Sequence, residues 1–109
     1  MSEKRVLKMT TLEKQLQEEL IKRCEMAQKQ CGYRGIHFLQ TIEKFGAVKT
    51  AKEILRKGRL SDEFEILEQA GLLKLTMEAT ITEHKYAELF TDDEVNSCYE
   101  VLCEYGYFS

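Results

Sequence analysis

The sequence predicts an all-α protein, a compact bundle of five to seven helices in which one long N-terminal helix precedes shorter ones. Each of four glycines follows an amphipathic run, namely Gly46, Gly58, Gly71 and Gly106, and the 109 residues include no proline. Glycine just beyond a helix end accepts the left-handed backbone that closes the last turn. No stretch alternates apolar and polar residues for long enough to indicate a strand.

The first predicted helix begins after Thr10 or Thr11 and ends at Gly32. Its apolar side chains recur every three or four positions and form one stripe, made of Leu12, Leu16, Leu20, Cys24, Ala27 and Cys31. At a rise of about 1.5 Å per residue the helix is about 30 Å long, so we expect it to extend beyond the bundle. An uncovered apolar stripe favours a second copy of the chain, which predicts a homodimer through residues 12–31.

Shorter amphipathic segments account for the rest of the bundle, and they cover residues 36–45, 47–55, 62–70, 77–81, 85–90 and 92–105. Ser61 is the expected N-cap of the third of these, with Asp62 and Glu63 in its positive first turn. Thr76 is expected to cap the short helix over 77–81. Thr91 and Glu94 have the spacing of a capping box, in which each side chain satisfies the other residue's free amide.

Length and composition fit one globular domain over residues 1–109, with a flexible tail at residues 1–10. Apolar residues make up 43% of the chain and charged residues 32%. No stretch approaches the roughly 20 apolar residues that span a bilayer, and the first residues lack the apolar segment of a secretory signal. These features predict a cytoplasmic protein without contact to a membrane, in which the four cysteines are reduced.

Charge is distributed unevenly along the chain, although the net charge is only −3. Residues 44–59 hold six Lys or Arg against one Glu, whereas residues 60–109 hold two Lys against twelve acids. The cations at positions 49, 52 and 56 share one side of a predicted helix. Together with the two that follow they form what we call the basic face: Lys49, Lys52, Arg56, Lys57 and Arg59.

The basic face has two interpretations. It is either a phosphate-binding surface or an ordinary solvated helix surface that acids of the last helix partly neutralise. Base-reading side chains do not cluster near it, and the aromatic residues of the second half lie apart from it, at Tyr99, Tyr105, Tyr107 and Phe108. These absences weaken a case for sequence-specific or single-stranded nucleic-acid binding.

The residues that catalysis and metal binding require are not grouped in the sequence. Only His37 and His84 offer imidazole bases, and no glycine-rich phosphate-binding loop is present. The cysteines lack C-x-x-C spacing and are expected to be small core residues. We therefore expect neither enzymatic activity, nor a metal site, nor a cofactor.

Glu78 is the carboxylate that stands out, because it lies among apolar neighbours. In one interpretation it belongs to a helix start near Thr76 and pairs with Lys52 or Arg56. In the other it is a buried acid in a ligand-binding cleft.

Several short segments, in this order and spacing, resemble a small helical domain found across bacteria, and the resemblance covers residues 20–107. The segments are Gly32-Tyr33 with Phe38-Leu39, Gly46-Ala47-Val48 with Thr50-Ala51-Lys52, Ser61-Asp62-Glu63-Phe64, Leu73-Lys74-Leu75-Thr76-Met77-Glu78, Leu89-Phe90-Thr91 with Glu94, and Tyr105-Gly106-Tyr107. That domain occurs alone and attached to HNH-type nucleases, restriction-like proteins and ATPases. The chain departs from it at Glu63, where glycine is expected, and at Leu67, where an aromatic residue is frequent.

The resemblance implies a non-catalytic accessory module near DNA-processing or phage-defence machinery. A stand-alone copy would be a partner subunit, or an inhibitor carried by a phage or mobile element. We therefore expect an interaction module that binds a larger protein. The alternative is a nucleic-acid-binding accessory protein that uses the basic helix within residues 44–59.

Overall fold

The computed structural model describes residues 10–108, so the tail predicted over residues 1–10 lies outside the described part of the chain except for Thr10, which caps the first helix. Within 10–108 the protein is all-α and contains no strand. Its α-helices are α1 (Thr11–Cys31), α2 (Ile36–Phe45), α3 (Ala47–Arg56), α4 (Phe64–Gln69), α5 (Met77–Ile81) and α6 (Asp92–Glu104). Two short 3₁₀ helices join them, η2 (Leu73–Leu75) and η3 (His84–Leu89). The predicted fold class, with its long first helix, is confirmed.

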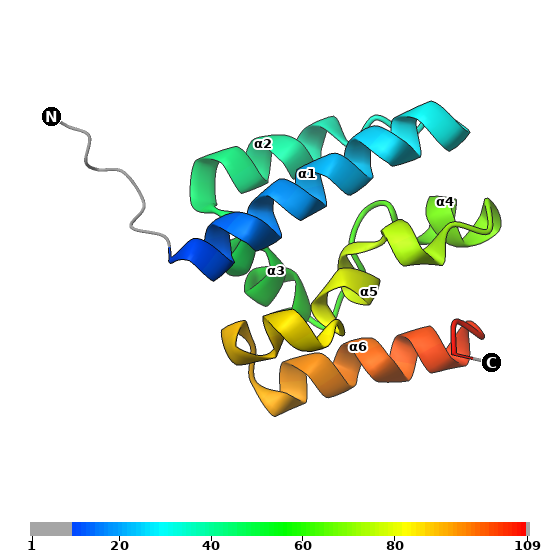
Figure 1. Cartoon of the computed structure of the whole chain (residues 1–109). Coiled ribbons are helices and arrows are strands. Elements are labelled where there is room, and N and C mark those ends of the chain that lie inside the picture. The colour runs from blue at the N-terminus through cyan, green and yellow to red at the C-terminus, as the bar shows by residue number, and fades with distance from the viewer. Residues whose placement is uncertain (1–9, 109) are drawn as a thin grey trace, which may run out of the picture.

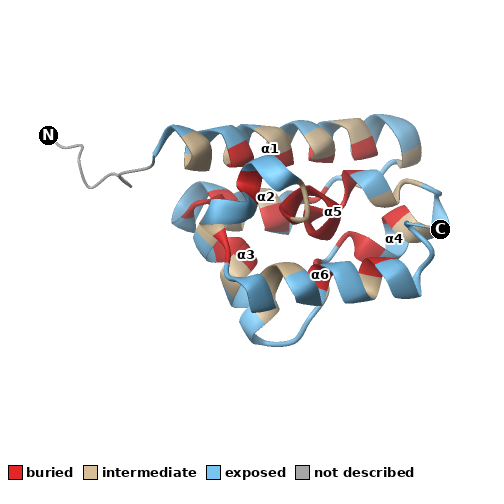
Figure 2. Cartoon of the chain, turned by 60° about the horizontal axis from the view of Figure 1, so that its bottom comes forward, coloured by how far each residue is buried: buried red, intermediate tan, exposed pale blue. Residues whose placement is uncertain are grey.

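The helices form two layers with a buried helix between them. Helices α1 and α2 lie on one side, α6 lies on the opposite side, and α5 runs through the middle (Figure 1). Helix α3 contacts α1, α2 and α6, and α5 packs against α6 and η2. All five residues of α5 are buried, which makes it the most enclosed helix in Figure 2. Any charged group on α5 must therefore find its partners inside the protein.

The apolar stripe of α1 faces the chain's own core. Leu16, Leu20, Cys24 and Ala27 are at most 6% exposed, and α1 contacts α2, α3, η2 and η3 along its length. The expectation that this stripe extends beyond the bundle is wrong for its length from Leu16 to Ala27, which the shorter helices cover, while Leu12 and Cys31 at its two ends are half-buried. The homodimer through residues 12–31 thereby loses the surface that motivated it.

A polar cluster around Arg23 holds the far end of the chain against α1. The Arg23 guanidinium donates to the Lys74 carbonyl at 2.7 Å and to Thr80 Oγ1 at 2.8 Å, and it pairs with Glu83 at 2.5 Å and with Glu19. The buried Tyr86 hydroxyl donates to Glu19 Oε1 at 2.5 Å. Burial alone would raise the pKa of Glu19, but the hydrogen bonds from Tyr86 and Arg23 hold it below its ordinary value.

Two capping boxes begin the longest helices. The predicted box at Thr91 and Glu94 is present: Thr91 Oγ1 accepts from the Glu94 amide at 3.1 Å, and Glu94 Oε1 accepts from the Thr91 amide at 2.8 Å. An equivalent pair at Thr10 and Glu13 begins α1 and was not predicted, although its residue types and spacing are the same. The predicted cap at Thr76 is confirmed, since its hydroxyl accepts from the Ala79 amide.

The Thr91→Ala variant should lower the free energy of unfolding by about 1 kcal/mol, because the Glu94 amide at the start of α6 loses the hydroxyl that accepts its hydrogen bond. Urea denaturation followed by circular dichroism measures this change. Ser97→Ala is the matched control in the same helix. The Ser97 hydroxyl only donates back to the Asp93 carbonyl, so its loss should leave stability nearly unchanged. Equal losses in the two variants would contradict the capping role.

Candidate functional site

Three residues of the basic face are engaged with carboxylates. Lys52 Nζ lies 2.8 Å from Glu94 of α6 and over the Phe90 ring, and Arg56 lies 2.5 Å from Glu53. Lys57 Nζ lies 3.8 Å from the same Glu53 carboxylate. The interpretation in which acids, including one from the last helix, partly neutralise this surface thus describes its centre.

Lys49 and Arg59 differ from these three. Within residues 10–108 neither of them has a carboxylate at ion-pair distance, and both are exposed. Lys49 Nζ lies 5.5 Å from the centre of the Phe45 ring. The structure therefore does not present five free cations on one side but separates the basic face into a neutralised centre and two free ends.

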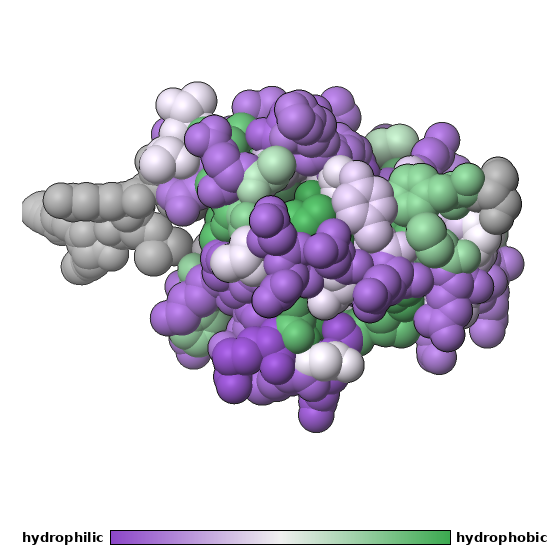
Figure 3. Space-filling view, turned by 90° about the horizontal axis from the view of Figure 1, so that it is seen from below, coloured by the Kyte–Doolittle hydropathy of each residue, from purple (hydrophilic) through white to green (hydrophobic). Residues whose placement is uncertain are grey.

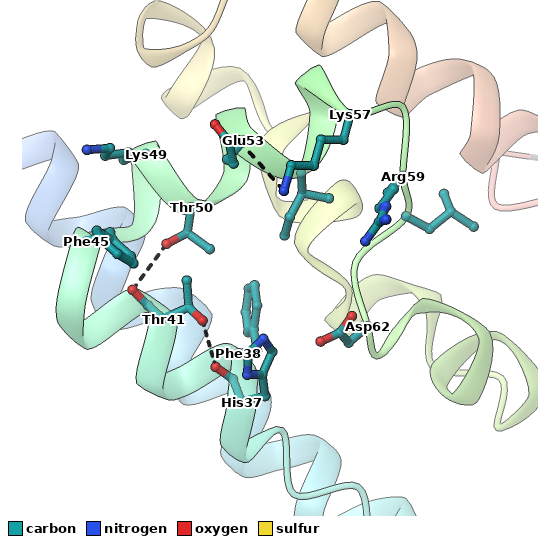
Figure 4. Close-up of a pocket in the computed structure, with 12 residues that line it drawn as sticks. His37, Phe38, Thr41, Phe45, Lys49, Thr50, Glu53, Lys57, Arg59 and Asp62 are labelled. Carbon is teal, nitrogen blue, oxygen red and sulfur yellow. Dashed lines mark hydrogen bonds and ion pairs between the residues drawn. The ribbon is translucent and has the colours of Figure 1, made fainter.

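A hollow of about 420 Å³ lies beside the basic face, and we call it the α2–α3 groove. Its walls come from α2, α3 and the connector over residues 59–62 (Figure 4). Phe38, Ile54 and Leu60 give it an apolar lining. Lys57 and Arg59 point toward its opening, whereas the Lys49 ammonium group turns away from it.

Glu78 is buried on α5 and is bound by the connector. It is 1% exposed, and it accepts from the Ser61 amide at 2.6 Å and from the Ser61 hydroxyl at 2.7 Å. The expected pairing with Lys52 or Arg56 is wrong, because those cations point to Glu94 and Glu53 instead. Ser61 does not cap a helix as expected, because its hydroxyl donates to Glu78 and α4 begins only at Phe64.

The other interpretation made Glu78 a buried acid in a ligand-binding cleft. Its burial is confirmed, but the structure places it in no such cleft. The carboxylate lies inside the core, and the α2–α3 groove is not lined by it. Burial raises the pKa of Glu78, while the two hydrogen bonds from Ser61 act against that rise. Glu78 therefore positions the connector that forms one wall of the groove.

Glu63, expected in a solvated first helical turn, is also buried. It is 2% exposed, and neither of its carboxylate oxygens has a hydrogen-bond partner. The single hydroxyl proton of neighbouring Ser61 is already donated to Glu78. Burial raises the pKa of Glu63 to about 7 from an ordinary value of 4.5, and the Glu78 carboxylate contributes to the rise. No sequence signal that we used distinguishes Glu63 from the exposed acids beside it.

A surface of exposed aromatic side chains lies at the C-terminal end of α6. The Tyr99 and Phe108 rings are 5.3 Å apart, and the Tyr107 and Phe108 rings are 4.9 Å apart. These three residues, which we call the aromatic surface, are 40%, 49% and 36% exposed for Tyr99, Phe108 and Tyr107. Figure 3 looks onto this side of the molecule and shows hydrophobic residues, in green, among hydrophilic neighbours at this end of the molecule. These aromatic residues stand out in the sequence, but their spacing does not predict that the rings meet.

The thiols and histidines are not arranged for metal binding. Among residues 10–108 no group of three or more His, Cys, Asp or Glu side chains is placed to hold a metal ion. Burial raises the pKa values of Cys24 and Cys98 to about 12, so both thiols stay protonated and unreactive at neutral pH. In the same part of the chain no helix combines the length and apolar composition needed to cross a bilayer.

Comparisons with known proteins give no relative. No family model matches the chain, no curated protein matches it, and no solved structure matches it. The resemblance to the small bacterial helical domain stays a prediction, and function must be argued from the surfaces described above.

Proposed function

We propose that this chain is a non-catalytic interaction module that binds a larger protein through the aromatic surface. The observation that supports this proposal is the exposure of Tyr99, Tyr107 and Phe108 as one contiguous group of rings. Aromatic side chains bury a large area on binding and lose little conformational entropy, so they dominate the binding energy of many interfaces.

The charge around the aromatic surface suggests the chemistry of the partner. Glu100 and Glu104 are exposed on the same helix, and the half of the chain from residue 60 onward is strongly acidic. A partner with an apolar depression surrounded by Lys or Arg would complement this surface, and the opposite charges would speed association. The resemblance makes cytoplasmic DNA-processing and phage-defence proteins the first partners to test, with this chain as a component or an inhibitor.

The nucleic-acid alternative has weaker support. Lys52 and Arg56 already pair with Glu94 and Glu53, and phosphate groups would have to compete with those carboxylates. Only Lys49 and Arg59 are free of such pairs among the five cations of the basic face, within the described residues.

A photo-crosslinking amino acid at one position of the aromatic surface can identify the partner and show that it contacts this surface. A benzoylphenylalanine in place of Tyr107 should form a crosslink to a single protein on illumination of cells, and mass spectrometry identifies it. The purified partner is then titrated against the double variant Tyr107→Ser/Phe108→Ser. We expect binding about 100-fold weaker, because two ring contacts of the interface are lost.

Phe45→Ser is the matched control, since Phe45 is 42% exposed on α2 and lies outside the aromatic surface. This variant should bind the partner as the parent chain does. Unchanged binding by the double variant, or an equal loss with Phe45→Ser, would contradict the proposal.

A further inference from the structure

The α2–α3 groove combines an apolar lining with positive charge at its opening. Its volume of about 420 Å³ falls in the range of sites for small molecules. Phe38 is only 4% exposed, so the floor belongs to the packed core, and the half-buried Ile54 and Leu60 form the flanks. This lining is suited to contact the apolar or aromatic part of a small ligand.

Two cations are placed to meet a charged group on such a ligand. Lys57, the residue that follows α3, and Arg59 of the connector project toward the opening (Figure 4). The nearest acid to Lys57, Glu53, is shared with Arg56, whose guanidinium lies closer at 2.5 Å. Arg59 has no ion pair within the described residues, so its charge is available to a ligand.

Two acids line the groove: Glu53, which pairs with Arg56 and Lys57, and Asp62, which has no such pair among the described residues and limits the charge that the groove accepts. Asp62 lines the groove opposite Arg59 (Figure 4), where it would repel a ligand with a second negative charge. We propose that the α2–α3 groove binds small monoanions that carry an apolar body, such as an aromatic carboxylate. In this site Lys57 and Arg59 hold the anion, and Phe38, Ile54 and Leu60 contact the body.

The fluorescent probe anilinonaphthalene sulfonate, a monoanion with two aromatic groups, tests the site in the whole chain. Its neutral analogue phenylnaphthylamine has the same body without the anion. We expect saturable binding of the sulfonate and at least tenfold weaker binding of the neutral analogue. Phenylbutyrate should displace the sulfonate, whereas phenylbutanol should not. Equal binding of charged and neutral probes, or no saturable binding of the sulfonate, would overturn the proposal.

Variants with opposite expected effects locate the site. Lys57→Gln/Arg59→Gln should weaken binding of the sulfonate about tenfold, and Asp62→Asn should strengthen it about threefold. All three side chains are exposed, so the fold should be kept, which circular dichroism verifies. Lys29→Gln, an exposed position on α1, is the control for loss of positive charge and should bind as the parent chain does. An unchanged affinity in the Lys57/Arg59 double variant would place the probe elsewhere and overturn the proposal.

Discussion

Replacing Glu63 with glutamine is expected to stabilise the protein by up to about 3 kcal/mol near about pH 9 and to change little near about pH 4. The buried, unpartnered Glu63 carboxyl has a pKa of about 7 in the folded chain, compared with an ordinary value of 4.5. The folded state therefore holds this proton more tightly than the unfolded state. The stability that Glu63 contributes is fully present below about pH 4.5 and is lost as the pH rises through 7. Glutamine does not ionise, so it removes that loss.

The groups around Glu63 do not obscure this dependence. Cys24 of α1 and Tyr33 of the following loop face it, and burial raises the pKa of each to about 12, so both stay neutral over the range. The negative charges of Glu78 and, more weakly, of the exposed Asp62 also raise the pKa of Glu63. Urea denaturation of parent and variant from about pH 4 to about pH 9 measures the difference.

Glu65→Gln is the matched control for the loss of one negative charge, since Glu65 is exposed in the first turn of α4, directly after Glu63. A Glu63→Gln difference that is constant across the range would show that Glu63 ionises in the folded chain as it does in solution.

Leu102→Ala should lower the free energy of unfolding by about 2 to 5 kcal/mol. Leu102 is fully buried and packs with Phe64 and Ala79, and it joins α6 to α4 and to the central α5. Truncation leaves a cavity between three helices that cannot close it without moving their backbones. Denaturation at fixed pH measures the loss.

Leu39→Ala removes the same atoms from a half-buried site on α2 and should have a clearly smaller effect. Equal losses in the two variants would show that Leu102 is not enclosed as the structure places it.

The parts of the fold that the sequence predicts are those set by neighbours along the chain. Helix α1 was predicted from one stripe of apolar residues, and its end from Gly32, whose φ of +80° requires the left-handed region. The capping box at Thr91 was likewise visible, because its two residues are three positions apart. Local spacing fixes such features, and tertiary packing did not alter them.

The parts that were missed depend on which segments meet. Ser61 has the residue type of a helix cap, but α5 lies close enough for Glu78 to accept both of its donors. Because Ser61 is bound to Glu78 inside the core, Glu63, two positions later, is buried as well. Tyr99 and Phe108 are nine positions apart, and only the turn after α6 brings their rings together. No periodic pattern in one sequence carries that information.

The contacts of Arg23 and Tyr86 have a consequence for the order in which the chain folds. Arg23 binds partners 51, 57 and 60 positions later, and Tyr86 reaches back 67 positions to Glu19. During synthesis α2 and α3, which contact α1, emerge soon after it, whereas the partners of Arg23 and Tyr86 in residues 74–86 leave the ribosome much later. Pairs this distant in sequence are slow to form, so α1 can pack on α2 and α3 first, and the Arg23 and Tyr86 contacts complete the fold only after residue 86 has emerged.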